Sequence, residues 1–148
     1  MSSYARIWLH MVFGTKYNKP MIKTESEKLI YDFMQEKLKE LDCIPMRING
    51  MPDHVHLLFL ANYKLSSAEI AMRVKGSCSH WINKNNILPE KFEWKEGIGV
   101  FSVSDALVSR TKRYIDLQKR HHSKFTFQQE CDQLFKEHEQ TIRNNSEE

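Results

Sequence analysis

The segment from residue 45 to residue 60, PMRINGMPDHVHLLFL, constrains the fold more than any other part of the chain. Residues 45–50 and 54–60 are rich in apolar side chains, and a turn-like Met-Pro-Asp sequence separates them. So short a connection makes two successive strands neighbours in one sheet. We therefore expect a hairpin here, and the other elements must be arranged around it.

Two segments with helical patterns flank this hairpin. Before it, Thr24 and Glu27 form a T-x-x-E capping box that precedes apolar residues at helical spacing. After it, Ser66 and Glu69 form a second capping box, and the apolar stripe that follows ends at residues 85–86. Each segment predicts an amphipathic helix that packs against a sheet.

Two further segments predict strands. Residues 6–13, RIWLHMVF, are aromatic and β-branched, and residues 92–104 contain β-type residues interrupted by glycines, which indicates a bent or broken strand. The order strand, helix, strand, strand, helix, strand is the split βαβ, ferredoxin-like pattern. This is an α+β fold with helices on one face of an antiparallel sheet. Its second face is left for a partner or for more chain.

The rest of the chain predicts more helix. We expect one helix from about residue 105 to residue 122 and a strongly polar one from about residue 126 to residue 143. A length of 148 residues, of which 41% are hydrophobic and 28% charged, fits one globular domain with one core. Residues 1–148 are therefore expected to form a single domain, with residues 123–148 as a helical tail.

Composition narrows the class of protein. The net charge of +3 is compatible with a polyanionic partner but does not by itself name DNA. Cys43, Cys78 and Cys131 are odd in number and widely spaced, which argues against a disulfide framework and against a cysteine zinc site. The N-terminus lacks the pattern of a secretory signal, and no stretch has the length of a membrane span. We expect a cytoplasmic protein without membrane contact.

His54 and His56 are the first candidate functional residues. Side chains alternate along a strand, so these two imidazoles lie on one face while Val55 faces the other layer. Two parallel imidazoles make half of a metal site. By pattern alone, half-exposed or hydrogen-bonded histidines at a strand edge are the commoner interpretation. Asp53 could support His54, although a turn aspartate is the commoner explanation.

The predicted helix at 105–122 places Tyr114, Gln118 and His121 in one narrow arc between Leu107 and Leu117. Its charged residues fall on the opposite side: Lys112, Arg113, Asp116, Lys119 and Arg120. The helix therefore brings a phenol and an amide to the same place. The ordinary alternative is a core tyrosine followed by a helix-forming glutamine, with His121 and His122 at the surface or at the helix end.

These residues resemble the single-tyrosine HUH transposases of prokaryotic insertion sequences, which include the repeat-associated tyrosine transposases. In that family a His-hydrophobic-His strand works with a tyrosine on a later helix. The matching segments occur in family order between about residues 6 and 122: HMVFGTKYNKP, MPDHVHLLF, SHWIN, FSVS and YIDLQKRHH.

The resemblance implies that His54, His56 and Gln118 bind a divalent metal, Mg²⁺ or Mn²⁺, and that Tyr114 is the nucleophile. The implied activity is cleavage and rejoining of single-stranded DNA at element ends through a covalent 5′-phosphotyrosine. A metal held by neutral ligands keeps its full charge for the phosphate. The implied partners are single-stranded DNA with hairpin ends and a second copy of the chain in a homodimer, with no small-molecule substrate.

Binding of single-stranded DNA requires basic and aromatic residues on one surface. The candidates are Lys16, Tyr17, Lys19, Arg73, Lys75 and Lys84, with Trp81 if it is exposed. The alternative for each is a solvated charge, and for Trp81 a place in the core. Three functions remain open: an active transposase, a domesticated nuclease that nicks hairpins, and a non-catalytic nucleic-acid-binding module.

Overall fold

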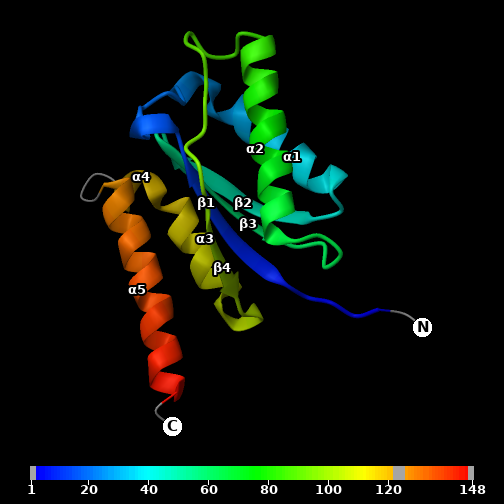
Figure 1. Cartoon of the computed structure of the whole chain (residues 1–148), viewed down its shortest axis with the longest axis vertical. Helices are drawn as coiled ribbons and strands as arrows, with labels where there is room; N and C mark the ends of the chain where they lie inside the picture. The colour runs from blue at the N-terminus through cyan, green and yellow to red at the C-terminus, as the bar shows by residue number, and fades with distance from the viewer. Residues whose placement is uncertain (1–2, 122–125, 147–148) are drawn as a thin grey trace.

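A four-stranded antiparallel sheet lies at the centre of the computed structural model, which describes residues 3–121 and 126–146 (Figure 1). Its strands are β1 (Trp8–Gly14), β2 (Ile44–Met51), β3 (His54–Leu60) and β4 (Gly99–Val103). They lie in the order β2-β3-β1-β4, and every neighbouring pair is antiparallel. This order confirms the α+β, ferredoxin-like prediction.

Helices α1 (Glu27–Glu40) and α2 (Ser67–Lys84) cover one face of the sheet. Alternate side chains of β3, Val55, Leu57 and Phe59, point into this layer and are completely buried. They form the main core together with the apolar stripes of both helices. The expected helical layer is therefore present.

The second face of the sheet is covered by the chain itself. Helices α3 (Val108–Asp116), α4 (Gln118–His121) and α5 (Phe127–Ser146) follow β4, and Figure 1 shows α3 and α5 on the side of the sheet away from α1 and α2. On this face Ile115 packs with Trp8 and Leu58 in a second, smaller core. Residues 122–125, where the tail was expected to begin, lie outside the described residues.

The start of α1 differs from the prediction. Residues 24–26 form a 3₁₀ turn, so the N-cap of α1 is Ser26, which makes no side-chain capping bond, and the predicted box at Thr24 is wrong. The second box holds in part. The Ser66 hydroxyl accepts a hydrogen bond from the Glu69 amide at 3.1 Å, while the Glu69 carboxylate pairs with Arg73.

Two predicted elements are shorter than expected. The strand at 92–104 is reduced to β4, and Trp94 forms only an isolated bridge with Thr15. The helix at 105–122 begins as a 3₁₀ turn over Asp105–Leu107 and breaks at Leu117 between α3 and α4. A 3₁₀ turn advances by a different angle from an α-helix, so the predicted arc fails at Leu107, which is 47% exposed.

None of the helices in the described part of the chain has the length and apolar character that crossing a membrane requires.

Gly50 sets how closely β2 approaches β3 beside the hairpin turn. It is paired with Val55, and a Cβ at this position would overlap the carbonyl group of His54. Gly50→Ala should therefore lower the free energy of unfolding in urea by about 1–3 kcal/mol. Gly76→Ala is the matched control, because Gly76 lies in α2 with open space around it and should gain about 0.5–1 kcal/mol. Equal stability of Gly50→Ala and the wild type would contradict this reading of the hairpin.

Candidate active site

His54 and His56 start β3 and point to the face that α3, α4 and α5 cover. Both side chains are completely buried, because β3 is an inner strand paired with β1 and β2. His54 and His56 are therefore not half-exposed, although both are hydrogen-bonded, as the commoner interpretation also allowed. Two buried imidazoles need hydrogen-bond partners or a ligand.

A neighbouring residue contacts Nδ1 of each imidazole, which is the ring nitrogen that points away from the cluster. Asp53 Oδ1 lies 2.7 Å from His54 Nδ1, and His10 Nε2 lies 2.8 Å from His56 Nδ1. Burial, together with the neighbouring His56, lowers the pKa of His10 to about 3, so His10 is neutral and its Nε2 can accept a hydrogen bond from His56 Nδ1. These bonds leave Nε2 of both His54 and His56 directed into the cluster. Asp53 is thus hydrogen-bonded to His54, which is the contact that the supporting role considered for it requires.

Tyr114 on α3 and Gln118 on α4 reach the same place. Gln118 is completely buried, and its Oε1 lies 3.0 Å from His54 Nε2. The Tyr114 ring lies edge-on to the ring of His56, with 5.8 Å between centroids. The structure thus brings together all four residues proposed from the sequence, although a helix break separates the last two. His121 lies in α4, and its side chain is outside the described part of the chain.

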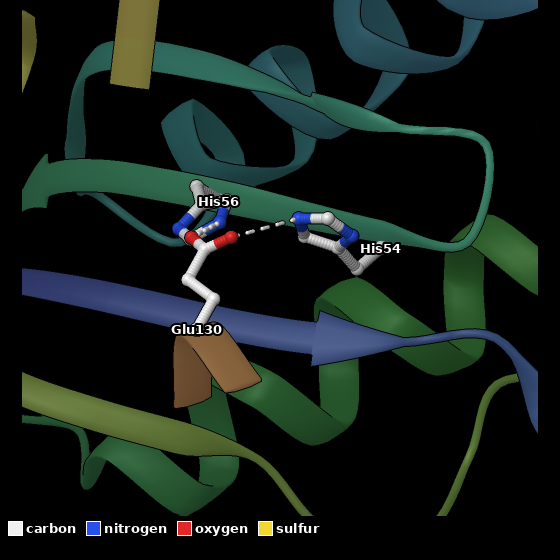
Figure 2. Close-up of side chains that lie close together, drawn as sticks. All are labelled: His54, His56 and Glu130. Carbon is white, nitrogen blue, oxygen red and sulfur yellow. Dashed lines mark ion pairs between the residues drawn. The ribbon is translucent and has the colours of Figure 1, made fainter. Parts of the chain in front are cut away.

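A fifth residue, Glu130 of α5, occupies the centre of this cluster (Figure 2). Its Oε1 lies 2.6 Å from His56 Nε2, and its Oε2 lies 3.6 Å from His54 Nε2. Tyr114 donates a hydrogen bond from its hydroxyl to Oε1 at 2.5 Å, and Gln118 Nε2 donates to the same oxygen at 3.0 Å. One carboxylate therefore contacts the predicted nucleophile and all three predicted metal ligands.

Glu130 was not among the residues proposed from the sequence. It lies in the polar tail, to which the family resemblance assigns no role, among several other acidic residues. The available signal was helical spacing, which puts Glu130 on the same face as Phe127 and Leu134. A carboxylate on the apolar face of a polar helix indicates a buried partner.

Hydrogen bonds set the charges within the cluster. Burial lowers the pKa of His54, but its bonds to Asp53 and Glu130 outweigh this effect and raise the pKa to about 9. Burial raises the pKa of Glu130, but hydrogen bonds from His54 and His56 hold that pKa below its ordinary value. Burial and the adjacent Glu130 raise the pKa of Tyr114. The cluster therefore combines an imidazolium at His54, a carboxylate at Glu130 and a neutral phenol at Tyr114.

The donor set fits a divalent cation. His54, His56 and Glu130 offer ligand atoms that all lie within 4.8 Å of one another, and Gln118 adds an amide oxygen. Imidazole nitrogens and oxygens are shared by sites for Mn²⁺ and Zn²⁺, and the oxygens suit Mg²⁺ as well. Metal-binding histidines typically donate a hydrogen bond from the ring nitrogen that faces away from the ion, as His54 Nδ1 does to Asp53 and His56 Nδ1 does to His10.

The candidate DNA-binding residues fall into two groups. Lys16, Tyr17 and Lys19 follow β1 at the end of the sheet where β3 begins, since the amide of Thr15 donates to the carbonyl of Asp53 at 2.9 Å. In this group Tyr17 is 77% exposed, and Lys16 pairs with Glu93 at 3.1 Å.

The second group lies on α2, across the sheet from the histidines: Arg73, Lys75 and Lys84. Arg73 pairs with Glu69, and Lys75 donates to the carbonyls of Lys95 and Gly97. Trp81 is partly buried and stacks on Phe33, with 4.4 Å between ring centroids. The structure therefore does not bring this group to the candidate active site.

Comparison with known proteins places the chain in a family. The family model described as "Transposase IS200 like" matches residues 3–118, which include His54, His56, Tyr114 and Gln118 but not Glu130. No curated protein matches the sequence closely enough to count as a relative.

Two solved structures share the fold. One is a candidate transposase from Deinococcus radiodurans R1, with a TM-score of 0.64 and 20% identity over 80% of this chain and 95% of that one. The other is a REP-associated tyrosine transposase bound to a REP hairpin, with a TM-score of 0.62 and 11% identity over 82% of this chain and 74% of that one. Because the family model spans most of the sequence, the chain belongs to the IS200-like transposase family.

Proposed function

We propose that this transposase cleaves and rejoins single-stranded DNA at element ends, with Tyr114 as the nucleophile. The observation that carries the proposal is the convergence of the Tyr114 hydroxyl with His54, His56 and Gln118 around one point. Attack by the phenol oxygen forms a bond to phosphorus and breaks the bond to the 3′ oxygen. A 5′-phosphotyrosine and a free 3′ hydroxyl result, and reversal by another 3′ hydroxyl rejoins the strands.

The chain's own residues position the reacting groups. His54, His56 and Gln118 are the proposed metal ligands, and Asp53 and His10 fix the orientation of the two rings. A bound Mg²⁺ or Mn²⁺ would polarise a non-bridging phosphate oxygen and stabilise charge in the transition state. Completely buried ligands exclude water, which strengthens these electrostatic interactions.

Two considerations support a hairpin-bearing DNA strand as the substrate. One structural neighbour is a tyrosine transposase bound to a REP hairpin. In this chain, Lys16, Tyr17 and Lys19 offer positive charge and an exposed ring beside the start of β3, which suits a phosphate backbone and a stacked base.

The proposal includes the homodimer that the family resemblance implies. In the arrangement described, however, Tyr114 and the histidines that it meets belong to the same chain.

Tyr114→Phe tests the nucleophile. Wild-type protein incubated with a single-stranded hairpin oligonucleotide and Mn²⁺ should give a covalent protein–DNA adduct on a denaturing gel, and Tyr114→Phe should give none, because it lacks the oxygen that bonds to phosphorus. Tyr63→Phe makes the same change at a tyrosine that is 49% exposed, beyond the opposite end of β3, and should form the adduct at the wild-type level.

An adduct that survives Tyr114→Phe would exclude Tyr114 as the nucleophile. Binding of the element's own end without any adduct in the wild type would instead favour the non-catalytic module. Whether the chain serves a mobile element or a domesticated nuclease is decided by rejoining, because a nickase leaves the cut strand unjoined.

His56→Ala tests the metal site. Titration of Mn²⁺ by calorimetry should show binding to the wild type and an affinity loss of more than about tenfold in His56→Ala, since even losing a second-shell partner costs about 10–100-fold. His80→Ala is the control, because His80 is an exposed histidine on α2, and its Mn²⁺ affinity should equal that of the wild type. Equal affinities for His56→Ala and the wild type would rule out His56 as a ligand.

A further inference from the structure

The candidate active site is closed to a DNA strand in this structure. His54, His56 and Gln118 are each 0% exposed, and Glu130 is 8% exposed. A scissile phosphate carries a nucleoside on either side, so it cannot reach buried ligands without displacing whatever covers them. The proposed function therefore requires a second arrangement of the chain.

The first turn of α5 provides this cover. The ring of Phe127 stacks on the imidazole of His54, with 4.3 Å between centroids and an interplanar angle of 3°. Phe127 also lies against Gly14 at the end of β1, where an added Cβ would come within 3.4 Å of the phenyl ring. One helical turn later, Glu130 fills the centre of the cluster (Figure 2). Phe127 and Glu130 together seal the face of the sheet over the histidines.

Further along, α5 is held to the rest of the protein more lightly. His138 lies 4.6 Å from the ring of Phe101, measured between centroids, while Phe135 on the same helix is 63% exposed. Gln128 donates to Asp132 and Arg143 donates to Glu139, and both of these hydrogen bonds lie within α5. Neither hydrophobic core includes a described residue of α5, so this helix can leave without disturbing them.

The Glu130 carboxylate makes the contacts that a substrate phosphate would need. It is an anion with two oxygens: one lies beside His56 Nε2 and the Tyr114 hydroxyl, and the other is on the side of His54. A non-bridging phosphate oxygen must approach the same metal ligands, and phosphorus must approach the same hydroxyl. Two anions cannot share this buried volume, so a docked Glu130 and a bound phosphate exclude each other.

We infer that α5 is an autoinhibitory lid, whose Glu130 carboxylate stands in the place of the scissile phosphate and must be displaced by the incoming DNA strand. This inference rests on the proposed function for the identity of the competing anion. Glu130 lies outside the segment that matches the family model, so the lid is carried by the part of the chain that the family match does not include. DNA binding and lid opening are linked reciprocally: whatever weakens the docking of α5 strengthens DNA binding.

Glu130→Gln is the direct test, because it keeps the shape of the side chain and removes its charge. Two quantities are measured: the Kd for a single-stranded hairpin oligonucleotide in EDTA by fluorescence anisotropy, and the initial rate of adduct formation at Mn²⁺ concentrations that saturate each protein. We expect Glu130→Gln to bind about three- to tenfold more tightly and to react faster by a similar factor. Glu139→Gln removes a carboxylate from a more exposed position on the same helix, and it should change neither quantity.

Phe127→Ala tests the lid without changing its charge. It removes the ring that stacks on His54 and should raise both DNA affinity and reaction rate, whereas Phe135→Ala on the exposed side of α5 should raise neither. Far-UV circular dichroism establishes that the variants keep the helical content of the wild type.

The outcomes separate the lid from the proposed function. If the wild type forms the adduct and Glu130→Gln reacts more slowly, or neither binds nor reacts better, Glu130 is not a competitor and the lid is overturned. If neither the wild type nor any variant forms the adduct, the proposed function fails. The Kd values of the wild type and Glu130→Gln in EDTA then decide by themselves whether α5 blocks DNA binding.

Discussion

Two imidazoles on an inner strand are the constraint on which the rest of the site depends. Because β3 is hydrogen-bonded along both edges, His54 and His56 can meet other groups only across one face of the sheet, and burial makes an unpartnered ring nitrogen costly. Four residues contact these ring nitrogens. Asp53 and His10 lie at Nδ1 of the two rings, and Gln118 and Glu130 lie at Nε2. The last two come from the C-terminal segment, which the histidines thereby bind to the sheet.

The strands and their order could be predicted from the sequence because each is a short apolar run between turn residues, and the hairpin at 45–60 restricts how the others pair. Helix ends were less predictable, since Thr24 and Ser26 are both suitable caps and only tertiary packing selects between them. Tyr114 and Gln118 were predictable as a pair because residues four apart stay close even across the break at Leu117. Glu130 was not, since no local pattern tells which acidic residue of a polar helix enters a distant cluster.

Glu130 also changes the electrostatics expected of the site. A divalent ion that replaced the proton on His54 Nε2 would have only neutral ligands in the proposed set of His54, His56 and Gln118, so it would present its full charge to a phosphate. The Glu130 carboxylate of a docked α5 would offset part of that charge and would stabilise a bound ion while no DNA is present. Removal of α5 would restore the full charge when the DNA arrives. The same movement that opens the site would thus strengthen the electrostatic attraction on which the proposed reaction depends.

Only five residues, 122–126, separate the end of α4 at His121 from the start of α5 at Phe127. A competitor attached by so short a segment acts at an effective concentration on the order of millimolar, whatever the amount of protein in solution. A carboxylate that would be a feeble inhibitor as a free molecule can therefore occupy the site most of the time. Dilution does not relieve such inhibition, and a short oligonucleotide with few phosphate contacts competes poorly with it. Only a strand that gains affinity elsewhere on the protein can displace the helix, so binding of DNA at the candidate active site would itself report that the protein has recognised the flanking DNA.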